Sequence, residues 1–196
     1  DKTWVAPSGA TLWMSYLDRE DDVMRYQGQA FNWIGFDELT QWPSPYAWNY
    51  MRSRLRSTRA SGLPLYMRAT SNPGGPGHQW VKKTFVDPQT PNKPFWATDE
   101  NGEEITWPKG HTREGEPLFR RKFIPATLFD NPYLSDDGLY EANLLSLPEH
   151  QRRQLLEGDW DINEGAAFPE FNRKIHVVEP FDIPRSWVRF RACDYG

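Results

Sequence analysis

The stretch that decides the fold reads Phe31-Asn32-Trp33-Ile34-Gly35-Phe36-Asp37-Glu38. A compact apolar run that ends abruptly in two acids predicts a fully buried strand with carboxylates at its carboxyl-terminal edge. This arrangement suits phosphate chemistry, in which an Asp helps to hold Mg²⁺ and the adjacent Glu polarises the attacking water. Apolar-Asp-Glu strings also arise by chance. The alternative from this stretch alone is therefore a strand end whose acids merely face solvent.

A second polar strand end follows along the chain. Ser44-Pro45 predicts the start of a helix, and residues 63–69 predict a strand that ends in Thr70-Ser71-Asn72. Hydroxyl and amide groups there could sense a γ-phosphate, although Ser, Asn, Pro and Gly are also common turn formers. We expect Asp37 and Asn72 to lie side by side on neighbouring parallel strands and to point into one crevice. The run Gly74-Gly75-Pro76-Gly77 is no P-loop, because no Lys-Ser/Thr follows it, and the 196 residues contain no Gly-x-x-x-x-Gly-Lys-Ser/Thr.

The composition narrows the class of protein. With 38% hydrophobic and 26% charged residues, the chain can form a packed core, which excludes wholesale disorder. A single Cys excludes a disulfide framework, and no apolar run approaches the roughly 20 residues of a membrane span. The four His residues show no ligand spacing to one another, which argues against a zinc site. The 10 Trp residues favour core packing over base stacking.

Further elements are predicted downstream. Residues 87–116 are rich in Pro, Gly and charge and read as an excursion from the main sheet, with a hairpin-type turn at Asn101-Gly102. Residues 118–125 predict a returning strand, and residues 139–145 and 148–157 predict a helical hairpin. A last strand is predicted over residues 187–193, with Asp194 at its tip.

Basic residues form two clusters. Arg52, Arg56 and Arg59 would share one helix face at i, i+4 and i+7, and Arg120-Arg121-Lys122 forms the second cluster. We consider the first cluster a possible contact for DNA or another subunit, although most charge runs are solvated faces. The net charge of −4 argues against tight binding of duplex DNA by this chain alone. The affinity of any such binding should fall steeply as the salt concentration rises.

Taken together, these elements resemble the large terminase subunit of tailed bacteriophages, the motor that packages DNA into proheads. The resemblance covers nearly all of the 196 residues and rests on the order and spacing of many short motifs. Besides residues 31–38, the matching motifs are Tyr26-Gln27-Gly28, Leu39-Thr40-Gln41-Trp42, Arg52-Ser53-Arg54-Leu55-Arg56, Ala69-Thr70-Ser71-Asn72-Pro73, Phe123-Ile124-Pro125-Ala126, Asp130-Asn131-Pro132-Tyr133-Leu134, Leu147-Pro148-Glu149, Leu156-Glu157-Gly158-Asp159-Trp160, Phe168-Pro169-Glu170-Phe171 and Asp194-Tyr195-Gly196.

The resemblance implies an α/β fold in three parts. Residues 1–125 would be the second half of a RecA-like ATPase sheet, residues 126–164 a small helical linker subdomain, and residues 165–196 the first strands of a ribonuclease-H-like nuclease domain. Asp37 matches the Walker B aspartate that holds Mg²⁺ with ATP, and Glu38 matches the catalytic glutamate. The residues that couple hydrolysis to movement or sense phosphate are matched by Thr70-Ser71-Asn72. Asp194 matches the first carboxylate of a nuclease site for Mg²⁺ or Mn²⁺.

The family's P-loop Lys and trans-acting arginine would lie upstream of these residues, and its other nuclease carboxylates downstream. We therefore expect an internal fragment with weak or no ATP hydrolysis and no DNA cleavage of its own. The implied partners are double-stranded DNA, the portal protein, the small terminase subunit and other copies in a ring on the prohead, with no membrane. The implied location is the host bacterial cytoplasm, outside the mature virion.

Two other functions remain open at this point. One is another RecA-like, nucleic-acid-dependent ATPase of the helicase kind, which would share only the Asp37-Glu38 and Thr70-Ser71-Asn72 pattern. The other is a non-enzymatic aromatic-rich binding module. That module predicts an exposed row of Trp side chains and no relation between Asp37-Glu38 and a phosphate pocket.

Overall fold

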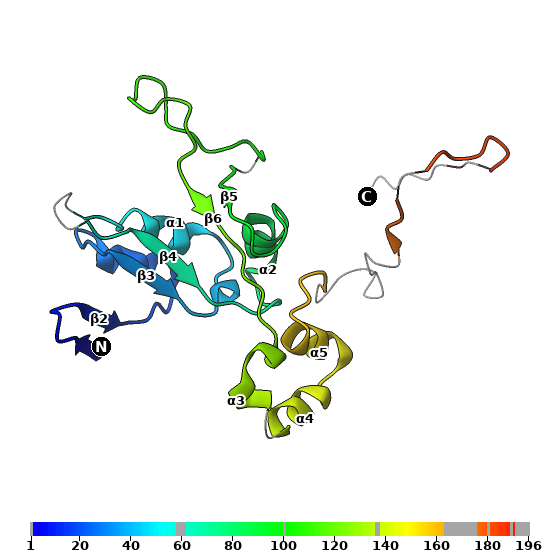
Figure 1. Ribbon diagram of the computed structural model, residues 1–196, viewed down its shortest axis with the longest axis horizontal. Helices are drawn as coiled ribbons and strands as arrows, with labels where there is room; N and C mark the ends of the chain where they lie inside the picture. Colours follow the sequence, from blue (N-terminus) through cyan, green and yellow to red (C-terminus); the bar gives the residue numbers. More distant parts are fainter. Residues whose placement is uncertain are drawn as a thin grey trace. The chain divides into compact units, whose positions relative to one another are not determined.

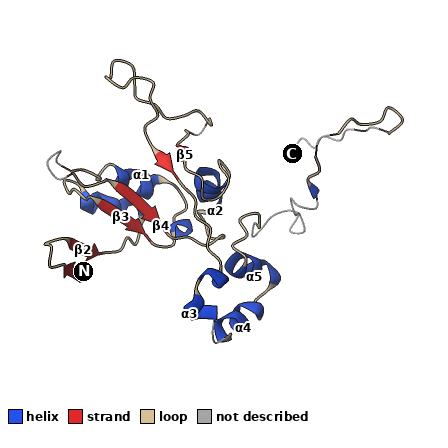
Figure 2. Ribbon diagram, in the orientation of Figure 1, coloured by secondary structure: helices blue, strands red, loops and turns tan. Residues whose placement is uncertain are grey.

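The computed structural model describes residues 2–57, 62–99, 101–135, 138–162, 176–179, 181–188 and 190. The chain divides into two compact units, Asp1–Glu164 and Gly165–Gly196. The first unit contains both helices and strands, and its last elements are helices (Figures 1 and 2). Its elements, in chain order, are β1 (Lys2–Val5), β2 (Thr11–Met14), the 3₁₀ helix η1 (Glu20–Tyr26), β3 (Trp33–Phe36), the 3₁₀ turn η2 (Leu39–Gln41), α1 (Tyr46–Arg52), β4 (Tyr66–Ala69), α2 (His78–Val81), the π-helical turn η4 (Lys82–Val86), β5 (Phe95–Trp96), β6 (Arg120–Arg121), η5 (Leu128–Asp130), α3 (Pro132–Ser135), α4 (Leu139–Leu145) and α5 (Glu149–Leu156).

The central feature is the unit β3–α1–β4. The two strands pair in parallel, with Trp33 opposite Tyr66 and Phe36 opposite Ala69, and Figure 1 shows them side by side. Between them, Ser44 helps to start α1, because its Oγ accepts a hydrogen bond from the Tyr46 N–H at 3.2 Å. A parallel strand pair joined through a helix is an α/β arrangement, as the sequence predicts.

Two hydrophobic cores lie around this unit. The first core consists of Val23, Tyr26, Ile34, Ala47 and Met51. The second core consists of Leu39, Trp48, Val81 and Trp160. Helix α1 contributes to both, because Ala47 and Met51 belong to the first core and Trp48 to the second. Through Trp160, the residues that follow α5 share a core with the residues that follow β3.

The prediction that residues 31–36 form a fully buried strand is wrong. In β3 Ile34 is buried, but Trp33 is 42% exposed. Side chains alternate between the faces of a strand, and the packing from α1 and η1 lies on the Ile34 face. On the other face the Trp33 ring folds over Gly35, where an added Cβ would lie 2.4 Å from the ring.

The prediction of one long arginine-bearing helix is also wrong. Helix α1 ends at Arg52, where the Ser53 hydroxyl donates a hydrogen bond to the Tyr50 carbonyl at 2.7 Å. The chain then extends beside the residues before β3, and the Arg56 N–H donates to the Phe31 carbonyl at 3.0 Å. Arg52 and Arg56 therefore share no helix face. Arg59 lies outside the described residues.

The excursion at residues 87–116 lies between two short strands. β5 and β6 pair antiparallel. The strand predicted over residues 118–125 forms only at Arg120–Arg121. The turn predicted at Asn101-Gly102 is confirmed: the Gly102 N–H donates to the Asp99 carbonyl at 3.2 Å, and Gly102 has φ +86°. The predicted helical hairpin is confirmed as α4 and α5.

Little of the second unit is described. Its described residues, 176–179, 181–188 and 190, contain no strand. Of the strand predicted over residues 187–193, only residues 187, 188 and 190 are described, so most of this prediction lies outside the described residues. Asp194 lies outside the described residues. In the described part of the chain, each helix is too short or too polar to cross a bilayer.

Candidate functional site

The predicted site residues meet where β3 and β4 end. Since Phe36 lies opposite Ala69, the next residues, Asp37 and Thr70, are neighbours. The Thr70 hydroxyl donates a hydrogen bond to Oδ1 of Asp37 and accepts one from the Glu38 N–H at 3.2 Å. The neighbouring parallel strands are as expected, but the residue beside Asp37 is Thr70, and Asn72 comes two positions later.

Glu38 has an unusual backbone conformation. Its φ of 51° and ψ of 57° lie in the left-handed region, which side chains with a Cβ rarely adopt. This conformation turns the chain sharply out of β3 into η2, and it leaves Glu38 exposed beside Asp37. Strain of this kind, which costs about 1–3 kcal/mol, persists only where surrounding contacts impose it, and it concentrates at functional sites.

Those contacts come from the loop after β4. The Leu39 N–H donates to the Thr70 carbonyl at 2.9 Å, and the Thr40 N–H donates to Ser71 Oγ at 3.1 Å. The Thr40 hydroxyl in turn donates to the Asn72 carbonyl at 3.0 Å, and Thr40 is only 2% exposed. Ser71 thus joins the two loops, and the hydroxyl of Thr40 is its buried partner. The sequence places Thr40 in the matching motif Leu39-Thr40-Gln41-Trp42, but only the three-dimensional pairing shows that Thr40 contacts the loop after β4.

Close backbone packing continues into the glycine-rich run. The Gly77 N–H donates to the Thr40 carbonyl at 2.7 Å. A Cβ at Gly77 would lie 2.0 Å from the Trp42 carbonyl oxygen, and one at Gly75 would lie 2.9 Å from the Thr40 carbonyl oxygen. These glycines therefore allow the backbones of the two strand-end loops to approach closely.

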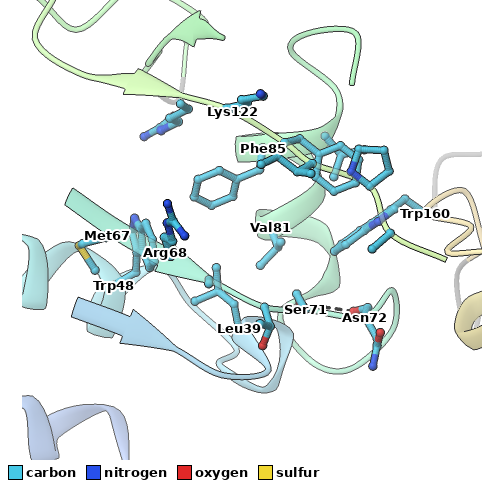
Figure 3. A pocket seen from close by; sticks show the side chains of 18 of the residues that line it. Leu39, Trp48, Met67, Arg68, Ser71, Asn72, Val81, Phe85, Lys122 and Trp160 are labelled. Atoms are coloured by element: carbon cyan, nitrogen blue, oxygen red, sulfur yellow. Dashed lines mark hydrogen bonds between the residues drawn. The ribbon is translucent and has the colours of Figure 1, made fainter. Parts of the chain in front are cut away.

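A large cavity extends from these loops. It has a volume of about 1230 Å³ and lies between the β4 edge and residues 118–127. Figure 3 shows Leu39, Val81, Phe85 and Trp160 around it, with Ser71 and Asn72 at one side. Asp37, Glu38 and Thr70 also line the cavity.

The cavity brings Arg52, from the first predicted basic cluster, together with the second cluster. Arg52 and Arg121 both line it, and their guanidinium groups lie 4.5 Å from the Phe119 ring centroid and 5.5 Å from the Phe85 ring centroid, respectively. Burial, and then the charge of Arg52, lowers the pKa of Arg121 to about 10. Among the described residues, no carboxylate lies within 4 Å of either guanidinium.

The acidic end of the site suits a magnesium–nucleotide complex better than a metal held by protein alone. In the described part of the chain, no three His, Cys, Asp or Glu side chains cluster to hold a metal ion. Mg²⁺ in phosphate chemistry needs only one or two carboxylates, because waters and substrate phosphates complete its shell. Asp37 fits this role: it is exposed, and its Oδ2 makes no hydrogen bond to any described residue.

Comparison with known families supports the sequence argument. The family model described as terminase large subunit, T4likevirus-type, N-terminal, matches residues 1–175. The chain belongs to this terminase family. No curated protein and no solved structure gives a significant match.

Membership in the terminase family favours the first interpretation over the other two. The aromatic-rich binding module also predicts a row of exposed Trp side chains. Instead, Trp48 and Trp160 are buried in the second core. Of the exposed Trp side chains among the described residues, Trp4, Trp33 and Trp96 lie on three different sheets, and Trp187 lies in the second unit.

Proposed function

We propose that this terminase chain forms part of the ATP-driven motor that moves double-stranded DNA into proheads. The observation that carries the proposal is the pairing of Asp37 and Thr70 at the carboxyl ends of two parallel strands, with Glu38 held beside them. Ligands of open α/β sheets bind at this edge of the sheet. In the complete protein, a nuclease activity with Mg²⁺ or Mn²⁺ would cut concatemers, and Asp194 would supply its first metal-binding carboxylate.

Each of these residues would have a separate role at the nucleotide. Asp37 would hold Mg²⁺, directly or through water, and Glu38 would orient and polarise the attacking water. Thr70, bound to Asp37, would sense whether a γ-phosphate is present. Ser71 and Asn72 would pass that change to Thr40 and the following loops, because their hydrogen bonds join those loops.

DNA, the portal protein, the small terminase subunit and further copies in a ring remain our proposed partners, and the host cytoplasm the proposed location. Of the arginines proposed for DNA or subunit contact, Arg56 is exposed, although its guanidinium also donates to the Gln29 carbonyl at 2.7 Å. Arg52 is half-buried at the cavity. Arg56 is therefore better placed than Arg52 to reach a partner.

Manganese can test the nucleotide site without requiring turnover. Mn²⁺ added with a non-hydrolysable ATP analogue should broaden the NMR signals of residues 37–40 and 70–72 in the 196-residue chain. Asp37→Asn should abolish this broadening, and Asp99→Asn, a change in the distant hairpin, should leave it intact. ATP hydrolysis by this chain alone should be weak or absent. Broadening that is centred elsewhere, or that persists in Asp37→Asn, would overturn the proposal.

A further inference from the structure

His78 connects two parts of the first unit that are far apart in sequence. It lies at the start of α2 and is 4% exposed. Its Nδ1 accepts a hydrogen bond from the Gly74 N–H at 2.8 Å, which ties the ring to the strand-end loop (residues 70–77). Its ring stacks on Trp160, with centroids 5.4 Å apart and planes inclined by 26°. Trp160 belongs to the helical segment (residues 149–161), which contains α5.

Two further contacts join the helical segment to residues on either side of His78. The Lys82 ammonium, one turn beyond His78, forms an ion pair with Asp161 at 2.7 Å. The side chain of Gln154 is buried against Gly74, where an added Cβ would lie 3.2 Å from both amide end atoms. The helical segment is therefore held at three places, against Gly74 of the strand-end loop, against His78 and against Lys82, and the His78 ring lies between Gly74 and Trp160.

The contact with Gly74 requires a neutral imidazole. Nδ1 can accept a hydrogen bond only while it carries no proton, and protonation would set an N–H against the Gly74 N–H. Burial lowers the pKa of His78, and the Lys82 charge lowers it further, whereas the Trp160 backbone and the carboxylates of Asp87 and Asp161 raise it. A histidine with a lowered pKa stabilises the folded state most above its ordinary pKa of about 6.5, and this contribution is lost as the pH falls below that value.

We propose that the neutral imidazole of His78 is a latch that holds the helical segment against the strand-end loop, and that protonation releases both together. The latch makes the two parts one cooperative unit, since neither can move away without breaking a buried hydrogen bond or a ring stack. Opening such a unit is a discrete event that amide hydrogen exchange detects. All contacts of the latch lie within this chain, and none of them involves Asp37 or a bound nucleotide.

Amide exchange of the 196-residue chain, followed by mass spectrometry between about pH 5 and pH 8 and corrected for intrinsic rates, tests the latch. Protection of peptides from the strand-end loop and from the helical segment should fall together, by roughly tenfold, as the pH decreases. His78→Asn keeps an acceptor near the Nδ1 position but does not titrate, and it should flatten this dependence. His78→Phe keeps a stacking ring without the acceptor, and it should lower protection of both segments at every pH.

Two more variants keep the test decisive if a change at His78 prevents folding. Lys82→Met removes the charge that lowers the pKa of His78, so the midpoint of the transition should move to higher pH. His111→Asn alters a histidine stacked on Trp107 in the excursion and should leave both segments unchanged. The proposal is overturned if His78→Asn keeps the wild-type pH profile, if Lys82→Met leaves the midpoint in place, or if only one segment responds.

Discussion

Replacing Trp160 with Ala tests whether the helical segment is an integral part of the first unit. The Trp160 side chain is 9% exposed and lies in the second core with Leu39, Trp48 and Val81. Besides its stack on His78, its ring meets Phe123 edge-on, with centroids 6.1 Å apart. Truncation would therefore remove the contact that joins the chain beyond α5 to the residues beneath the candidate site.

The expected loss follows from the area that the ring buries. A Trp side chain buries about 200 Å², and at about 25 cal/mol per Å² its removal from water contributes about 5 kcal/mol. Measured aromatic-to-Ala changes in cores cost about 3–5 kcal/mol, because surrounding groups close only part of the space. We expect Trp160→Ala to lower the free energy of unfolding by about 4 kcal/mol, a large part of the roughly 5–15 kcal/mol of a typical domain.

Urea unfolding followed by far-ultraviolet circular dichroism measures this loss without relying on Trp fluorescence. Trp4→Ala is the matched control: Trp4 lies on β1 and is 51% exposed, so its loss should cost less than about 1 kcal/mol. A Trp160→Ala variant no less stable than the Trp4→Ala control would refute the reasoning. Residues 149–161 would then fold without support from the second core.

Two further predictions concern the close backbone packing at Gly77 and the arginine at the cavity. Gly77→Ala should lower the free energy of unfolding by about 3 kcal/mol, because the new Cβ would meet the Trp42 carbonyl oxygen at 2.0 Å. Gly110→Ala, with open space but φ +86°, should cost only about 1 kcal/mol in the same urea assay, and equal losses would contradict the steric argument. Arg121→Met should leave stability unchanged or raise it by up to about 1 kcal/mol, because a half-buried guanidinium that has no carboxylate partner among the described residues is replaced by an apolar chain. A clear loss of stability in thermal or urea unfolding would contradict this reasoning.

Local sequence patterns predicted the elements that depend on interactions between neighbouring residues. Ser44-Pro45 precedes α1 as predicted, because the Ser44 hydroxyl accepts a hydrogen bond from the Tyr46 N–H and the ring of Pro45, the N-cap residue, presets its φ. The end of α1 was mispredicted, since Arg54 and Arg56 are good helix formers. Pairing of residues 54–56 with Phe31, which no local pattern encodes, outweighs that propensity.

The residue that contacts Asp37 likewise could not be predicted from local sequence. The sequence placed the two polar strand ends together, because parallel strands end at one edge of a sheet. Which residue meets Asp37 depends on register, and the alignment of Phe36 with Ala69 selects Thr70 over Asn72. A register shift of one or two residues leaves the sequence pattern unchanged but alters every contact across the strands.

By itself, the sequence determined the terminase family, the parallel strand pair and the chemical groups at its edge, because these depend on residue types in a fixed order. The tertiary structure decided which of these groups touch. It gave Asp37 a hydroxyl partner, placed Arg52 beside the cavity with Arg121, and set His78 between Gly74 and Trp160. These contacts join residues far apart in the chain, and packing and register bring them together.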